Sequence, residues 1–122
     1  MASDVMEIPE DLEFVEVLGS APEPTEDDPD VWRVEAPVGD AGEEFVALSF
    51  DIGARSVRLT KGATGEFEIE IYREQVDRIL LYSRDGESGI IVEVAVPDFR
   101  CELRVVVSPR FRLVDPMLYS GH

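Results

Sequence analysis

The residues that could act as nucleophiles lack a base at a useful position. The chain has one cysteine, Cys101, and one histidine, His122, which is the last residue. A catalytic thiolate needs a neighbouring base, usually a histidine. Cys101 alternates with Phe99 and Leu103, a pattern typical of the apolar face of a strand, where cysteine acts as a small hydrophobic side chain. With no serine in a nucleophile-elbow motif, the sequence predicts no catalytic residues and a non-enzymatic protein.

Three glutamates could form a pair of catalytic carboxylates. Glu66, Glu68 and Glu70 share one face of an expected strand, with about 7 Å between neighbours. Glycosidases use carboxylates at such separations, but they also need aromatic walls and a pocket that shifts one pKa. The aromatic residues fall mostly on the inner face, so we interpret the glutamates as a solvated row paired with Arg58 or Arg104.

The run APEPTEDDPD, residues 21–30, contains five carboxylates and three prolines. It lacks the alternating aspartates, central glycine and closing glutamate of a calcium-binding EF-hand loop. Zinc would need several cysteines or histidines, and KGATG at 61–65 does not match a phosphate-binding loop. The sequence therefore predicts no metal site and no cofactor.

The charge of the chain is strongly negative and unevenly distributed. Acidic residues number 27 against 11 lysines and arginines, which gives a net charge of −16. Residues 1–44 hold fifteen of the acids and a single base, Arg33, whereas residues 45–122 hold twelve acids and ten bases. Such a surface repels phosphate backbones and anionic membranes and attracts basic proteins. We expect a basic protein partner, no direct nucleic-acid binding and no membrane binding.

The expected compartment is the bacterial cytoplasm. One cysteine allows no internal disulfide, which fits a reducing compartment. The first residues show no basic segment followed by an apolar one, and no apolar run is long enough to span a membrane. Lys61 is the only lysine, and this preference for arginine is typical of a GC-rich bacterial genome. Adaptation to high salt would spread the acidic residues over the whole surface.

Several segments alternate apolar and polar residues with the period of a half-buried strand. Residues 55–72 contain RSVRLT and GEFEIEIY, joined by KGATG, which predicts a hairpin with Arg58 facing the glutamate row. The dipeptide Asp85-Gly86 predicts a second hairpin. Further strands are expected at residues 31–37, 45–51, 99–107 and 110–114, and the last of them is expected at an edge of the sheet.

The remaining segments are less regular. Pro9 and Gly19 suit a helix over residues 9–18, whereas the run EFVEVL suits a strand, and we favour the strand. Residues 72–78 have room for one helical turn. Short sequential connections predict a mainly β, single-domain antiparallel meander over residues 1–122. It should form a curled sheet, barrel or sandwich of about seven to nine strands, with at most one or two short helical turns. Within it, residues 1–44 form an acidic third with a loop at 19–30, and residues 45–122 form the regular strands.

The acidic third is the candidate binding region. We hypothesise a small non-enzymatic protein of the immunity or antitoxin type, which neutralises a basic bacterial toxin or nucleic-acid-acting enzyme. Tryptophan and arginine are enriched at binding hot spots, although the tryptophan fits the core equally well. The candidate partner-binding residues are Glu23, Glu26, Asp27, Asp28, Asp30, Trp32, Arg33, Asp40, Glu43 and Glu44.

Two other classes of function stay open at this point. A β-barrel could bind a small ligand or catalyse a reaction at a mouth formed by the loops at 19–30 and 37–44. Alternatively, the chain could be a structural or assembly module whose edge strand near 110–114 pairs with another chain. We expect a monomer or a weak homodimer.

Overall fold

Nine strands and one short helix make up the described part of the chain. The computed structural model describes residues 6–39, 43–63, 66–96 and 99–114. The elements are α1 (Asp11–Leu18), β1 (Glu23–Pro24), β2 (Val31–Pro37), β3 (Glu44–Asp51), β4 (Ser56–Ala63), β5 (Glu66–Arg73), β6 (Val76–Arg84), β7 (Glu87–Val96), β8 (Phe99–Ser108) and β9 (Arg112–Val114).

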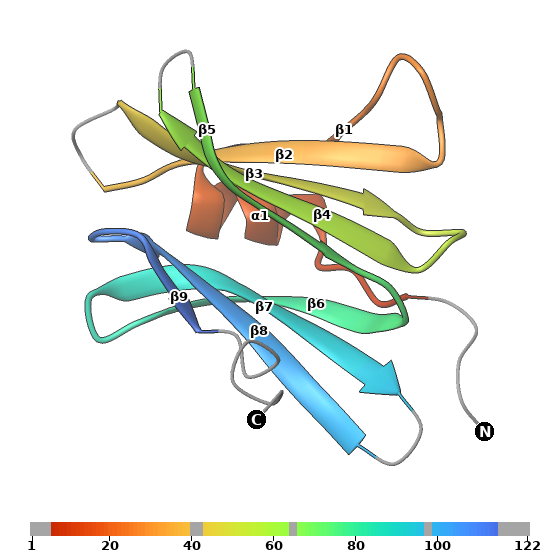
Figure 1. The fold of residues 1–122 in the computed structure, drawn as a ribbon. Coiled ribbons are helices and arrows are strands. Elements are labelled where there is room, and N and C mark those ends of the chain that lie inside the picture. The colour runs from red at the N-terminus through yellow and green to blue at the C-terminus, as the bar shows by residue number, and fades with distance from the viewer. Residues whose placement is uncertain (1–5, 40–42, 64–65, 97–98, 115–122) are drawn as a thin grey trace.

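The strands form two antiparallel meanders that face each other (Figure 1). One sheet has the order β1-β2-β3-β4-β5 and the other the order β6-β7-β8-β9, so within each sheet every strand pairs with its neighbour in sequence. The prediction of a mainly β antiparallel meander is confirmed. No pairing joins the two sheets among the described strands, so the sandwich option is right and the closed barrel is wrong. The last strand, expected at 110–114, is confirmed at a sheet edge but is shorter, because β9 begins at Arg112.

The core lies between the sheets because alternate residues of each strand point inward. In the five-stranded sheet, Val34 of β2 lies opposite Leu48 of β3, which lies opposite Leu59 of β4. In the four-stranded sheet, Ile79, Val92 and Leu103 form the corresponding row, and all these side chains are buried in one cluster. Apolar side chains on the two facing sheet surfaces drive the packing, because their burial removes them from water.

The turns explain why the chain reverses direction where the sequence predicted hairpins. Asp85 and Gly86 have φ angles of 56° and 76°, the left-handed conformation that a two-residue hairpin turn requires. The hairpin of β4 and β5 is confirmed as well, with Arg58 of β4 bound to Glu70 of β5 at 2.7 Å. The alternation of apolar residues and the turn dipeptide therefore determined the registers.

The favoured strand over residues 9–18 is wrong, because this segment is helix α1. Its left-handed C-cap is Gly19, at φ 91°, as the helix alternative required. Phe14 and Leu18, four residues apart, are buried on the same helical face. The Phe14 ring stacks on Phe50 of β3 with centroids 6.2 Å apart. Tertiary packing therefore overrides the β propensity of the segment.

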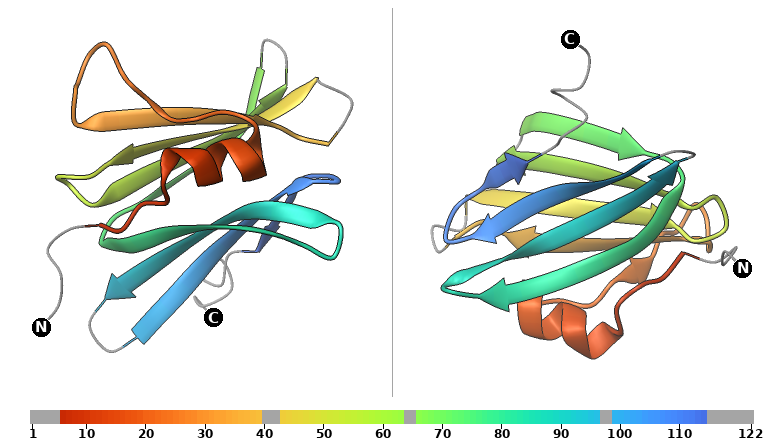
Figure 2. Two further views of the ribbon diagram at one scale, coloured as in Figure 1. Left: turned by 180° about the vertical axis from the view of Figure 1, so that it is seen from behind. Right: turned by 90° about the horizontal axis from the view of Figure 1, so that it is seen from below.

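Helix α1 covers one open side of the sandwich. It packs against β2 of one sheet and against β6 and β7 of the other. Figure 2, left, shows it lying across the gap between the two sheets. The acidic residues of the helix are thereby attached to the folded body of the molecule.

The suggested helical turn at 72–78 is wrong. The chain instead passes from β5 to β6 through a sharp bend at Gln75, whose φ is 59°. The bend is fixed by the amide of Val76, which donates to the carbonyl of Arg55, and by the amide of Ala95, which donates to the carbonyl of Gln75. This bend moves the chain from the first sheet to the second.

Candidate partner interface

The acidic tract at residues 21–30 forms a short hairpin with the start of β2. Pro24 of β1 lies opposite Trp32 of β2. The amide of Thr25 donates to the carbonyl of Val31 at 2.8 Å, and the hydroxyl of Thr25 donates to the carbonyl of Asp28 at 2.9 Å. The Asp28 carboxylate accepts from the amide of Asp30 at 2.9 Å. These bonds define the loop conformation and leave its carboxylates on the surface.

The structure divides the predicted binding residues into two groups. The group from Glu23 to Arg33 lies at the β1–β2 hairpin, whereas Glu43 and Glu44 lie beyond the far end of β2. The length of β2, seven residues or about 20 Å, separates the loop carboxylates at 26–30 from Glu43 and Glu44. Asp40 lies outside the described residues. Ser20, at the start of the loop at 19–30, donates to the carbonyl of Glu35 near the end of β2 at 2.8 Å, and residues 40–42 lie outside the described residues. The mouth expected between the loops at 19–30 and 37–44 therefore stays a prediction.

Glu44 differs from the hairpin carboxylates because it has an internal partner. Its carboxylate forms an ion pair with the ammonium group of Lys61, which is 6% exposed. That ammonium group also lies 5.5 Å from the centre of the Phe111 ring. Glu44 therefore compensates a buried charge of its own fold, whereas Glu43 is exposed.

Helix α1 adds exposed carboxylates that the sequence reasoning did not select. With those of the hairpin they form what we call the acidic surface, whose members are Glu10, Asp11, Glu13, Glu16, Glu23, Glu26, Asp27, Asp28 and Asp30. All are exposed, and among the residues that the structure describes none forms an ion pair with a cation. Arg33, the nearest arginine in sequence, is bound to Glu35 at 2.7 Å. The helix signals at Pro9 and Gly19 could have revealed this set.

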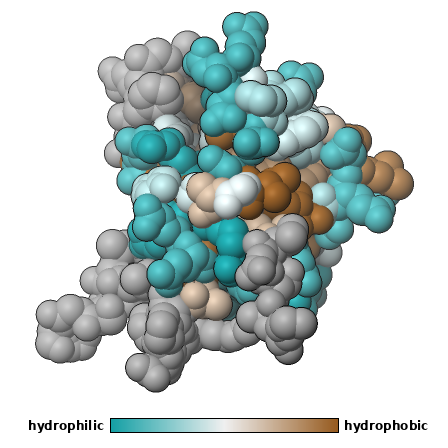
Figure 3. Space-filling view, turned by 90° about the vertical axis from the view of Figure 1, so that its right-hand side faces the viewer, coloured by the Kyte–Doolittle hydropathy of each residue, from teal (hydrophilic) through white to brown (hydrophobic). Residues whose placement is uncertain are grey.

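An apolar hollow lies beside the acidic surface, between the start of α1 and the hairpin. We call it the Trp32 hollow; its volume is about 170 Å³ and it is lined by Ile8, Asp11, Phe14, Pro22, Trp32, Phe50 and Ile52. Figure 3 views this end of the molecule and shows apolar surface bordered by hydrophilic side chains. Trp32 is half-buried and packs against the core, so it belongs partly to the core and partly to the surface.

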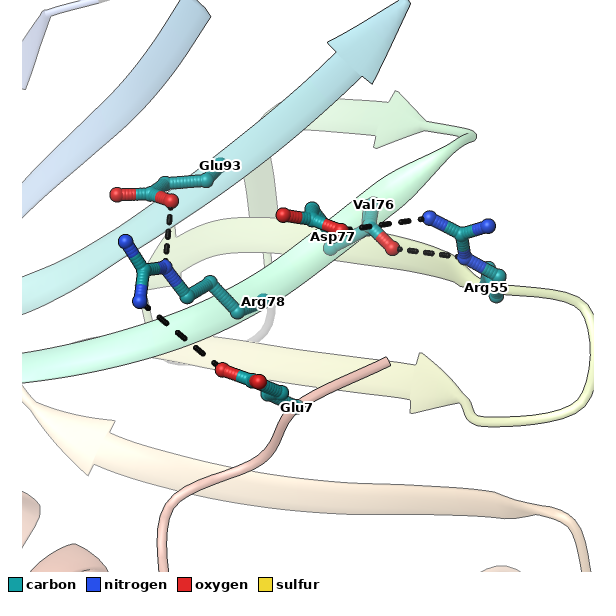
Figure 4. A network of polar contacts seen from close by, with 6 residues as sticks. All are labelled: Glu7, Arg55, Val76, Asp77, Arg78 and Glu93. Atoms are coloured by element: carbon teal, nitrogen blue, oxygen red, sulfur yellow. Dashed lines mark hydrogen bonds and ion pairs between the residues drawn. The ribbon is translucent and has the colours of Figure 1, made fainter. Parts of the chain in front are cut away.

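The charges on the four-stranded sheet are organised differently. Arg78 of β6 binds Glu93 of β7 at 2.6 Å and also approaches Glu7 at 4.0 Å (Figure 4). The hydrogen bond and charge of Glu93 raise the pKa of Arg78 above its usual range. Arg55, in the turn between β3 and β4 of the other sheet, donates to the carbonyl of Val76 at 3.2 Å and lies 3.7 Å from Asp77. These side chains stabilise the junction between the N-terminal segment, β6 and β7.

The residues considered for catalysis are described only in part. Cys101 is half-buried against the core, as the alternation predicted, and His122 lies outside the described residues. The guanidinium of Arg58 lies 5.2 Å from the centre of the Tyr72 ring in addition to binding Glu70, which confirms the paired-row interpretation for that glutamate. Within the described ranges no group of three or more histidine, cysteine or acidic residues could hold a metal ion. No helix there is long and apolar enough to cross a membrane.

Comparison with known proteins gives a structural likeness without a sequence relative. No protein-family model and no curated protein matches the chain. Among solved structures, a chain of the "contact-dependent growth inhibition toxin - immunity protein complex from Klebsiella pneumoniae 342" superposes with a TM-score of 0.73. The match covers 89% of this chain and 94% of the other at 13% identity. The two chains therefore share a fold.

Proposed function

We propose that the chain is a non-enzymatic inhibitor of the immunity type, which binds and neutralises a basic toxin or nucleic-acid-acting enzyme. The observation that carries this function is the acidic surface: nine exposed carboxylates without an internal cation among the described residues. Enzymes that act on nucleic acids need basic clefts, because affinity depends on lysine and arginine neutralising phosphates. A dense field of opposite charge accelerates encounter with such a cleft and selects against acidic partners.

The structural likeness supports the same function. The similar chain comes from a structure of a toxin with its immunity protein, and the likeness covers 89% of the present chain. Of these two roles, the inhibitor fits a chain with a net charge of −16, since a toxin acting on nucleic acid would need the opposite charge. A location in the bacterial cytoplasm belongs to this proposal, and the single cysteine is compatible with it.

The test begins with a tagged form of the full chain, used to isolate a basic protein partner from the source organism. The partner is then expressed alone and together with the chain in bacterial cells, and colony formation is counted. We expect toxicity from the partner alone and restored growth on co-expression. A partner that is harmless alone, or toxicity that persists although the two proteins co-purify, would contradict the function as an inhibitor.

A further inference from the structure

The Trp32 hollow combines an apolar wall with a single carboxylate. Six of its seven lining residues are apolar, and the seventh is Asp11 in the first turn of α1. Its volume of about 170 Å³ is close to that of a cavity that holds one benzene-sized group, about 150 Å³. Pockets for drug-sized ligands are larger, about 300 Å³ or more. The size therefore suits one side chain.

We propose that the Trp32 hollow anchors an arginine side chain of the basic partner; this inference rests on the proposed function. The alkyl stem of an arginine is apolar and can lie along the walls formed by Trp32 and Ile52. Its planar guanidinium group stacks on aromatic rings and binds a carboxylate through two parallel hydrogen bonds. Trp32 and Asp11 supply an aromatic side chain and a carboxylate in one hollow.

The charges around the hollow favour this occupant over an apolar side chain. Asp11 is exposed and has no cation among the described residues, so an apolar occupant would cover its carboxylate without compensating the charge. Glu10 precedes Asp11, and Glu23 of the hairpin follows Pro22, which lines the hollow, so further exposed carboxylates border these lining residues in sequence and attract cations. A lysine lacks the planar fork and therefore makes a poorer fit to a carboxylate beside an aromatic wall.

The helix beside the hollow supplies apolar surface for the remainder of the contact. Leu12 and Val15, one turn apart on α1, are 66% and 45% exposed. Binding hot spots typically consist of an anchor in a pocket surrounded by contacts that exclude water. The hollow, with these two side chains nearby and carboxylates around them, has that composition.

The chain contains one tryptophan, so its indole N–H gives a single resonance that reports directly on the hollow. The experiment titrates the full chain with a hexa-arginine peptide and, separately, with a hexa-lysine peptide at low salt. We expect the arginine peptide to shift the Trp32 indole resonance and to bind about threefold or more tightly than the lysine peptide. Equal affinities without an indole shift would overturn the inference.

Two variants with equal charge separate the hollow from general attraction. Asp11→Asn and Glu13→Gln each remove one negative charge from an exposed position on α1, but only Asp11 lines the hollow. We expect Asp11→Asn to lower the affinity for the arginine peptide about fivefold, and Glu13→Gln to lower it by less than twofold. Equal losses, with the peptide still bound, would overturn the arginine anchor and leave the proposed function intact. If the unmodified chain does not bind the peptide at all, both the arginine anchor and the electrostatic basis of the proposed function would be contradicted.

Discussion

The acidic surface and the four-stranded sheet show two different uses of charge. Residues 6–39 contain eleven acidic residues and one arginine, whereas residues 76–114 contain six of each sign. In the sheet, charges bind one another, as Arg78 does with Glu93 and Arg112 with Glu87 at 3.2 Å. On the acidic surface the carboxylates have no cation among the described residues. Several charges of the sheet are paired within the fold, whereas the carboxylates of the acidic surface are available to a partner.

The contrast also shows what holds the acidic surface in place. Repulsion between like charges opposes a compact state, so the carboxylates do not stabilise this region by attraction to one another. The attachment comes from buried apolar side chains, chiefly Phe14 and Leu18 of α1. The acidic surface therefore depends on the core, and variants of the two sets should have separable effects.

The largest effect is expected when that attachment is removed. Phe14 is fully buried and stacked on Phe50, so Phe14→Ala should lower the free energy of unfolding by about 3–5 kcal/mol, measured by urea denaturation. Leu12→Ala, at an exposed position on the same helix, should cost less than about 0.5 kcal/mol. Similar losses for the two variants would mean that α1 is not packed as described.

The next effect concerns association with the basic partner. The double variant Asp27→Asn/Asp30→Asn removes two exposed charges from the hairpin loop and leaves Asp28, which accepts the loop hydrogen bond, unchanged. We expect the association rate constant to fall about tenfold at low salt, with a smaller change in the dissociation rate, as measured by surface plasmon resonance.

The matched control removes the same charge from the other region. Asp85 in the β6–β7 turn and Glu102 on β8 are exposed, and Asp85→Asn/Glu102→Gln also removes two negative charges. This variant should slow association by less than about twofold. Equal slowing by the two double variants would show that net charge, rather than the acidic surface, controls encounter.

The sequence predicted the strands well because their signals are local. Alternation with period two defined the rows through Leu59 and Leu103, and Asp85-Gly86 specified a turn that few other residues can form. Helix α1 was missed because its outcome depends on a distant contact, the stacking of Phe14 on Phe50. A β-prone segment becomes helical when burial of one helical face outweighs its local preference.

The candidate site could be predicted only in part, for a related reason. The charge imbalance of the first third is visible in the sequence, but its division in space is not. Strand β2 carries Glu44 to the far end of the sheet, where it binds Lys61, and helix formation brings Asp11 to the same hollow as Trp32. Glu44 thus lies apart from the hairpin carboxylates although both belong to the acidic third, and Asp11 and Trp32 share a hollow although they are 21 positions apart. Both outcomes depend on strand pairing and helix packing, which the sequence alone does not show.

The third prediction tests repulsion within the acidic surface. Loss of two like charges should raise the thermal midpoint of Asp27→Asn/Asp30→Asn above that of the unmodified chain at low salt, by the equivalent of a few tenths of a kcal/mol. This difference in thermal midpoint should disappear near 0.5 M salt, because the Debye screening length, about 10 Å at 0.1 M, is much shorter there. A variant that is less stable than the unmodified chain at both salt concentrations would show that these aspartates have stabilising partners.

The smallest effect concerns the four-stranded sheet, where the ionisation of Tyr82 should change stability at high pH. Burial, followed by the charge of Glu87, raises the pKa of Tyr82 above its ordinary value of 10.0, and its hydroxyl donates to Glu87 at 3.2 Å. Because the folded state holds this proton more tightly, the stabilisation is fully present below pH 10.0 and is lost as the pH rises through the folded-state pKa. Glu87→Gln should lower the pKa of Tyr82, and Tyr82→Phe should remove one late-titrating tyrosine from the ultraviolet absorbance curve. Loss of amplitude at the ordinary tyrosine pKa in Tyr82→Phe, with the late-titrating part of the curve unchanged, would show that this side chain is not buried beside Glu87. The contrast between paired and unpaired charge would then be weaker than the structure indicates.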